Sequence, residues 1–248
     1  YSDFLSGKLK KVESRGSATP EWLWETFTSR YNYDYISANP YINSAGGDLK
    51  DFVGECTTHW KATGTFAGII DAWDEDWNQE LGTVHPKDLT NTALKTENDR
   101  KTIIHYIQPH RPYISSNTNM HTWWAKEEIE ESEKGTKRKL LEKTKFLWSP
   151  VFSRIPSKFQ KEIKDLFNIG NSFEKLVKEV GEEQVKEYYR QDLRMALEQI
   201  ERFVNETEGK IVVTADHGEL LGEKGEWGHP IGSQKSELIK VPWLEVER

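Results

Sequence analysis

Short runs of β-branched and apolar residues alternate along this chain with longer segments of helical pattern. The most continuous run, at 211–215, reads IVVTA, and its lack of polar alternation predicts a strand buried on both faces. A second strong run at 102–107 is followed by a proline, and weaker runs lie at 33–38 and 67–71. Because helical segments separate these strands, the pattern predicts an α/β fold with a mainly parallel sheet sandwiched by helices.

The clearest helix lies between the two strongest strands. Its apolar residues, from Val185 to Val204, step by three to five positions and so keep to one face. A proline in the first turn, beside an acidic residue, predicts two further helices at 86–94 and 19–27. The run at 241–246 contains a proline, which predicts a last strand near a sheet edge.

The domain organisation follows from length and from one segment of unusual composition. With 248 residues, of which 35% are hydrophobic, the chain supports one sizeable core, and we expect a single domain over 1–248. Residues 123–168 differ in kind, because 126–145 is dense in Lys and Glu and aromatic residues follow. We interpret this segment as a helical insertion whose charges form a solvated face rather than an interaction tail.

Charge and cysteine content limit the function classes. Lys and Arg number 34 against 41 Asp and Glu, giving a net charge of −7, so nucleic acid is not expected as a partner. No apolar stretch approaches the ~20 residues that cross a bilayer, so no membrane span is expected. A single cysteine, Cys56, excludes an intrachain disulfide framework and a cysteine-based zinc site. Oligomeric state and compartment stay open.

An acidic residue and a histidine follow the most continuous strand. Asp216 and His217 come directly after 211–215, and in open α/β sheets ligands collect beyond the carboxyl ends of strands. A carboxylate beside an imidazole suits a divalent ion such as Zn²⁺ or Mn²⁺. The alternative is that Asp216 caps the next helix and His217 is an ordinary surface residue.

Three further histidines lie near predicted strand ends. His105 lies within the second strand, and His110 follows it between two prolines that make a stiff platform. His229 lies in a glycine-rich stretch, 218–232, that is too long for a tight connection, and such loops often carry function. Singly each histidine is more often structural, but together with Asp216 they indicate a site.

A candidate nucleophile lies at the start of the first predicted helix. Thr19 precedes Pro20 there, where a hydroxyl points toward the positive end of the helix dipole and an anion such as phosphate or sulfate is stabilised. The alternative is a structural N-cap, for which Ser and Thr are the usual residues. Without other residues, the cap is the better explanation.

Three segments together resemble a known family. The run VVTADHGELLGE at 212–223, followed by GHP at 228–230, resembles the C-terminal half of the alkaline phosphatase superfamily in its sulfatase-like branch. HYIQPHRPY at 105–113 resembles the middle motif of that branch, and GSATPEWLWETF at 16–27 resembles its nucleophile segment. The three matches occur in the family's order and span nearly the whole chain.

The resemblance implies a reaction and its first participants. It implies hydrolysis or transfer of a phosphate or sulfate ester in two in-line steps through an enzyme ester. Thr19 would be the nucleophile, and Asp216 and His217 would be ligands of a divalent metal, with Zn²⁺, Mn²⁺, Ca²⁺ and Mg²⁺ as the possible ions. The substrate would be an ester in a small molecule or on a glycan.

The same resemblance assigns the remaining histidines. His110 and His229 would lie on the opposite side of the ester, where they bind a second metal or stabilise the leaving oxygen. His105 would be their neighbour at the substrate or second metal. The fold implied is alkaline phosphatase-like.

The chain departs from the family's pattern in three respects. Sulfatases in the strict sense carry C/S-x-P-x-R, and Cys56 is not in such a pattern, which disfavours a formylglycine nucleophile. Strict sulfatases also tend to carry a Lys at the position of His229. The histidine therefore favours phosphoryl, phosphono or phosphodiester substrates over sulfate esters. The family's first strand ends in a D-x-x-R motif with metal-binding carboxylates, and none precedes Tyr1. We therefore expect a domain that lacks its first strand and a site poor in metal.

A second function class stays open beside the enzyme. A non-catalytic or degenerate member of the same superfamily would bind an anionic or glycan ligand. In that case tryptophans would line a sugar surface, since aromatic rings stack on sugar faces. The residues expected there are Trp60, Trp73, Trp77, Trp123 and Trp124.

Overall fold

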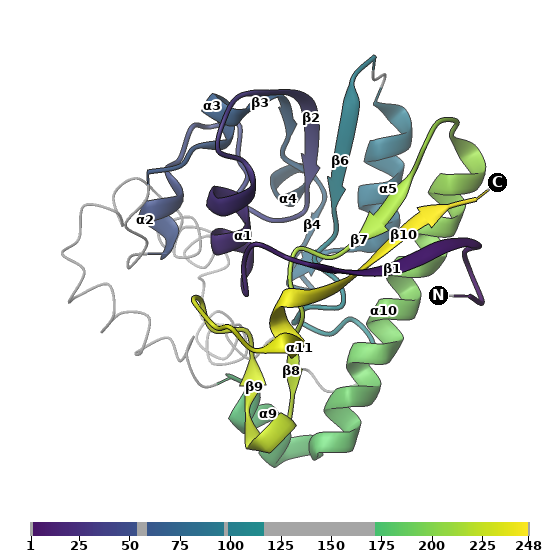
Figure 1. The fold of residues 1–248 in the computed structure, drawn as a ribbon. Coiled ribbons are helices and arrows are strands. Elements are labelled where there is room, and N and C mark those ends of the chain that lie inside the picture. The colour runs from purple at the N-terminus through teal and green to yellow at the C-terminus, as the bar shows by residue number, and fades with distance from the viewer. Residues whose placement is uncertain (1, 54–58, 97–98, 117–171, 248) are drawn as a thin grey trace, which may run out of the picture.

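The computed structural model describes residues 2–53, 59–96, 99–116 and 172–247. Within these ranges the chain forms a mixed α/β fold with one parallel sheet, one three-stranded antiparallel sheet and two small antiparallel hairpins (Figure 1). The predicted insertion at 123–168 lies outside the described residues. None of the described helices has both the length and the apolar character that crossing a bilayer requires.

The parallel sheet has the order β3-β2-β6. Its central strand is β2 (Tyr31–Ser37), flanked by β3 (Phe66–Ile70) and β6 (Lys101–His105). Both neighbours run parallel to β2, as crossover connections require. The predicted strands at 33–38, 67–71 and 102–107 are therefore confirmed, with boundaries shifted by one or two residues.

The second sheet is antiparallel and has the order β1-β10-β7. It contains β1 (Gly7–Glu13), β10 (Lys240–Val246) and β7 (Val212–Thr214). The prediction of a mainly parallel sheet is wrong for β7, which pairs antiparallel with β10. The strand is also not buried on both faces, since Val212 is 41% exposed. Val213 packs against the cluster that contains Leu244, and both valines also line a cavity.

The last strand, β10, occupies the centre of its sheet and not the expected edge. It pairs with β1 along seven residues and with β7 along three. Pro242 lacks a backbone N–H, but its carbonyl accepts a hydrogen bond from the Thr214 hydroxyl at 2.7 Å. Pro242 also lies one residue beyond the part of β10 that pairs with β7, so the proline stands where that ladder ends.

The three predicted helices are confirmed. They are α1 (Thr19–Thr26), α5 (Pro86–Lys95) and α10 (Glu182–Glu206), and both shorter helices have proline in the first turn. Shorter elements connect them: α2 (Leu49–Val53), α3 (Ala62–Thr65), α4 (Ala72–Glu75), α9 (Ser172–Val180), α11 (Ser236–Ile239) and η3 (Glu223–Gly225), with hairpins β4 (Trp77–Asn78)–β5 (Thr83–Val84) and β8 (Leu220–Leu221)–β9 (Trp227–Gly228).

Alternation along β2 divides the core into two layers. Tyr35 and Ile36 are both fully buried, and successive strand residues point to opposite faces. Tyr35 packs with Leu23 of α1, whereas Ile36 packs with Leu89 of α5. Helices therefore cover both faces of the parallel sheet and fix the position of its carboxyl edge, where His105 ends β6.

The long helix α10 contacts both sheets (Figure 1). Phe203 packs against the cluster that contains Leu89, next to the parallel sheet. Leu197 and Val204 pack with Leu244 of β10 in the antiparallel sheet. One apolar face of the helix therefore spans the space between β6 and β7.

Candidate active site

Thr19 is the first residue of α1, and its hydroxyl is directed at the segment after β7. The N-cap of this helix is Ala18, which makes no side-chain cap, so the cap interpretation of Thr19 is wrong. Instead Thr19 Oγ1 donates to Asp216 Oδ2 at 2.6 Å, and His217 Nε2 lies 3.3 Å from the same hydroxyl. The hydroxyl therefore has two neighbouring groups that can accept its proton.

The turn before α1 is held by close backbone packing and by one carboxylate. A Cβ on Gly16 would lie 2.2 Å from the backbone nitrogen of Trp22, so glycine is required there. Glu21 Oε2 accepts from the backbone nitrogen and hydroxyl of Ser17, each at 2.8 Å, and from Gly232 nitrogen at 3.1 Å. This carboxylate thus ties the start of α1 to the loop that follows His229.

Asp216 carries the negative charge of this group. Burial raises the pKa of its carboxyl, but His217, His105 and the Thr19 hydroxyl outweigh it and leave the pKa lowered. His105 Nε2 lies 3.8 Å from Asp216 Oδ2, and its Nδ1 lies 2.8 Å from the hydroxyl of Tyr35. Burial lowers the pKa of His105, so this ring is neutral at pH 7. Asp216 caps no helix, because its carboxylate accepts from His217 nitrogen and Thr19.

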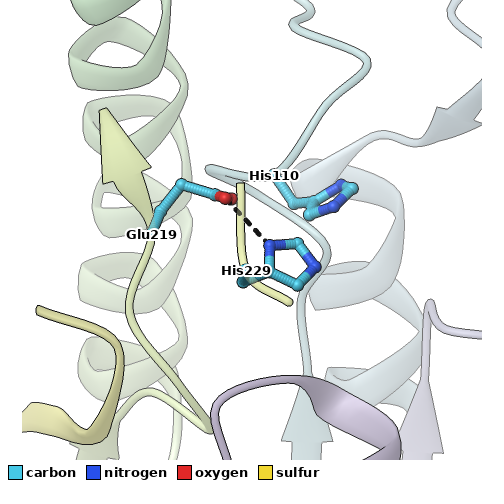
Figure 2. Close-up of side chains that lie close together, drawn as sticks. All are labelled: His110, Glu219 and His229. Carbon is cyan, nitrogen blue, oxygen red and sulfur yellow. Dashed lines mark hydrogen bonds and ion pairs between the residues drawn. The ribbon is translucent and has the colours of Figure 1, made fainter. Parts of the chain in front are cut away.

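A second group lies beside the first and contains His110, Glu219 and His229. Each offers one ligand atom, and these atoms lie within 4.8 Å of one another. Figure 2 shows Glu219 and His229 joined by a hydrogen bond, with the ring of His110 beside them. The bond joins His229 Nδ1 to Glu219 Oε1 at 2.9 Å. Among the described residues, this is the group of three such side chains that is compact enough to hold a metal ion.

Backbone carbonyls determine the tautomers of two histidines. Nδ1 of His110 contacts the carbonyl oxygen of Arg111, and Nδ1 of His217 lies 2.7 Å from the carbonyl oxygen of Gly218. A carbonyl can only accept, so each Nδ1 carries the hydrogen and each Nε2 keeps a lone pair. Metal-binding histidines commonly have one nitrogen anchored in this way while the other binds the ion.

The third histidine is oriented by a carboxylate. Burial raises the pKa of Glu219, but the hydrogen bond from His229 and the nearby rings outweigh it, so the pKa is lowered and the group is ionised. His229 therefore donates from Nδ1 to Glu219. Burial, with His229 close by, lowers the pKa of His110 to about 4, so its ring is also neutral at pH 7. A neutral imidazole keeps a lone pair on one nitrogen, so His110 can act as a metal ligand.

Close contacts between histidine rings join the two groups into one site. The ring centroids of His217 and His229 lie 4.4 Å apart, and those of His110 and His229 lie 5.0 Å apart. All three line one end of a cavity of about 1800 Å³, together with Thr19 and Asp216. A ligand at this end would meet the hydroxyl and the imidazoles at once.

The structure brings the predicted site residues together. The set predicted from sequence lies around one end of the cavity: Thr19, His105, His110, Asp216, His217 and His229. Glu219 belongs to the same site and was missed. A period of two could have identified it, because His217 and Glu219 are two positions apart in a non-helical segment and so share a side.

Of the three described tryptophans, Trp60 and Trp73 belong to the core rather than to a sugar surface, whereas Trp77 lines the cavity of the site. Trp60 is 7% exposed and donates to the carbonyl of Phe27, so it belongs to the core. Trp73 is partly buried and donates to the carbonyl of Ile42. Trp77 is 40% exposed. The remaining two, Trp123 and Trp124, lie outside the described residues.

Comparison with known proteins adds no relative. No protein-family model, curated protein or solved structure matches this chain. The assignment of function therefore depends on the geometry of the site and on the motifs in the sequence.

Proposed function

We propose that this protein is a metal-dependent hydrolase or transferase that acts on phosphate or sulfate esters, with Thr19 as nucleophile. The observation that carries the proposal is the pair of proton acceptors at the Thr19 hydroxyl, Asp216 at 2.6 Å and His217 at 3.3 Å. A threonine hydroxyl is a weak nucleophile until a neighbouring group takes its proton. A structural hydroxyl at a helix start has no need of either residue.

The first step transfers the phosphoryl or sulfuryl group to the enzyme. Thr19 Oγ1 forms a bond to phosphorus or sulfur, and its proton passes to Asp216 Oδ2. The bond to the leaving oxygen breaks on the opposite side, and that oxygen departs with the bonding electrons and takes a proton from solvent. In the second step water, or an acceptor alcohol in a transferase, forms the new bond to phosphorus or sulfur and gives its proton to solvent, while Thr19 departs and takes its proton back from Asp216.

The donor set of the site suits a divalent ion. His110, Glu219 and His229 would hold it, since two nitrogens and one carboxylate suit Zn²⁺ or Mn²⁺ better than Ca²⁺ or Mg²⁺, which prefer oxygen ligands. Asp216 and His217 are the predicted ligands of an ion on the Thr19 side. When bound, the metal supplies positive charge that polarises the ester and stabilises its oxygens.

The proposal is tested by trapping the enzyme ester. The protein is titrated with Zn²⁺ and Mn²⁺ by calorimetry and then incubated with 4-nitrophenyl phosphate or 4-nitrophenyl sulfate. We expect release of nitrophenol and, after an acid quench, a modified peptide that contains Thr19 by mass spectrometry. Release without modification of Thr19 would contradict its role as nucleophile. Metal and anion binding without any release would instead support the non-catalytic alternative.

A further inference from the structure

The hydroxyl of Tyr35 lies beside the last residue of β6. Tyr35 is fully buried in the central strand β2, where it packs with Leu23 of α1. It pairs with Ile103, two positions before His105, so the side chains of Tyr35 and His105 point to the same face of the sheet. The Tyr35 hydroxyl lies 2.8 Å from Nδ1 of His105.

This contact determines which nitrogen of His105 carries a hydrogen. A phenol keeps its proton at pH 7, because its ordinary pKa is about 10, and burial raises the pKa of Tyr35 further. A buried hydroxyl needs an acceptor, and among the described residues Nδ1 of His105 lies within hydrogen-bond distance. The neutral ring therefore has its hydrogen on Nε2, and a charged ring has one on both nitrogens. Nε2 carries a hydrogen in either state.

Nε2 of His105 lies beside the carboxylate of Asp216. It is 3.8 Å from Oδ2, the oxygen that accepts from the Thr19 hydroxyl at 2.6 Å. At this distance the contact is an attraction between the N–H dipole and the negative charge rather than a hydrogen bond. Both side chains are largely buried, at 15% and 16% exposed, so water weakens the attraction little. Oδ1 is held separately, by the backbone nitrogen of His217 at 3.0 Å.

Aromatic neighbours hold the ring of His105 in this position. The ring of Trp22, on α1, meets it edge-on, with centroids 6.1 Å apart. The centroid of the Tyr35 ring lies 5.9 Å away. Packing and the hydrogen bond at Nδ1 together restrict the rotation of the imidazole, as is required of a residue that orients another group.

We propose that His105 is a positioning residue that holds Oδ2 of Asp216 toward the Thr19 hydroxyl, and that it is not a metal ligand. Nδ1 is used by the Tyr35 hydroxyl and Nε2 carries a hydrogen, so neither nitrogen has a lone pair to give to an ion. The family resemblance implies instead a place for His105 at the substrate or second metal. The inference deepens the proposed function and rests on it, because the orientation of Asp216 matters when Thr19 is the nucleophile.

The hydrogen on Nε2 is measured first, without metal or ester. Long-range ¹H–¹⁵N correlation spectra of the full chain at pH 8 show which nitrogen of each imidazole carries a hydrogen. The chain has seven histidines, and His105→Gln assigns the signal of His105 by its loss. We expect Nε2–H for His105 and Nδ1–H for His110 and His217, whose Nδ1 atoms contact carbonyls. Added Zn²⁺ should leave the His105 pattern unchanged.

Two variants separate the N–H group of His105 from the space that its ring fills. His105→Leu has no donor, and we expect kcat for 4-nitrophenyl phosphate to fall about 10-fold with KM nearly unchanged. His105→Gln keeps an N–H donor of similar reach and should recover most of this loss. His59→Gln, at an exposed position, is the control and should change neither constant. Far-ultraviolet circular dichroism confirms that the variants fold.

Three results would overturn the proposal. One is an Nε2 of His105 without hydrogen, in the metal-free chain or after Zn²⁺ is added. Another is an equal loss of kcat in His105→Leu and His105→Gln, which would assign the effect to packing. The third is a rise in KM at constant kcat, which would place His105 at the substrate. Absence of hydrolysis by the parent chain would instead contradict the proposed function, whereas an Nε2–H that persists with Zn²⁺ would still support the contact with Asp216 over metal binding.

Discussion

The hydroxyl of Thr19 donates a 2.6 Å hydrogen bond to the carboxylate of Asp216, a residue 197 positions further along the chain. Thr19 begins a helix packed on the parallel sheet, whereas Asp216 follows a strand of the antiparallel sheet. The bond therefore crosses from one sheet to the other at their common edge. A pairing of this kind has little value for local helix stability, which supports a chemical role.

Replacing the Thr19 hydroxyl tests that role directly. Thr19→Ala removes the atom that would attack the ester, so we expect hydrolysis of 4-nitrophenyl phosphate to fall by at least ~10³-fold. Thr19→Ser keeps the hydroxyl and should retain measurable activity. Initial rates at saturating metal give the comparison. Equal losses in the two variants would indicate that the methyl group and packing matter rather than the nucleophile.

Glu219 is expected to control metal affinity. Glu219→Gln keeps the size of the side chain but removes the negative charge of a proposed ligand that also orients His229, so we expect metal binding to weaken at least ~10-fold. Calorimetric titration with Zn²⁺ measures the dissociation constant. Glu198→Gln, at an exposed position on α10, is the matched control. Unchanged affinity in Glu219→Gln would place the ion elsewhere.

The helices could be predicted from the sequence, because residues close together in the chain determine where a helix begins and which of its faces is apolar. Proline in the first turn placed α5 at Pro86–Lys95, and one-sided apolar spacing placed α10 at Glu182–Glu206. The error at β7 has a physical cause. An apolar run specifies burial but not the partner that buries it, and Val213 pairs with Leu244, thirty-one positions away, in a sheet that periodicity could not predict.

The site shows the same division between local and long-range information. Strand-end positions identified His105, Asp216 and His217, because β6 and β7, in two different sheets, end near each other. Glu219 was missed because its assignment depends on His229, which lies ten positions away on another segment. The sequence therefore indicates which residues lie near strand ends. Which of these side chains contact each other depends on the conformation of the loops that carry them.

Glu21 is expected to act as a positioning residue for the loop that carries His229. Its Oε2 accepts three hydrogen bonds, two from Ser17 and one from Gly232. Glu21→Gln loses the charge that these donors share, and we expect a loss of about 1–3 kcal/mol in the free energy of unfolding. Hydrogen exchange in 230–233 should also become faster. Glu25→Gln, exposed on the same helix, should change neither quantity.

The core beneath the site depends on Leu23. This side chain is fully buried between α1 and the parallel sheet, packed with Tyr35 and Phe27. Leu23→Ala should lower the free energy of unfolding by about 2–5 kcal/mol, since it removes buried methyl groups and leaves a cavity. Leu9→Ala, at a position that is 44% exposed, should cost less than ~1 kcal/mol. Urea denaturation followed by tryptophan fluorescence compares them.

Asp48 is expected to make the free energy of unfolding depend on pH. Burial raises the pKa of its carboxyl, but the hydrogen bond with His59 and the backbone nitrogens of Lys50 and Trp60 outweigh it, so the pKa is lowered in the folded chain. A depressed carboxyl pKa stabilises the fold above the unfolded value of about 3.9, and this contribution disappears as the pH falls through the folded pKa.

Asp48→Asn tests this dependence by removing the titration. The variant should be less stable than the parent at pH 7, because a neutral amide binds these donors more weakly. The difference should shrink as the pH falls below about 4, where the parent carboxyl also becomes neutral. Urea denaturation at pH 7, 5 and 3 gives the two curves. Parallel curves over this range would mean that Asp48 does not change its proton affinity on folding.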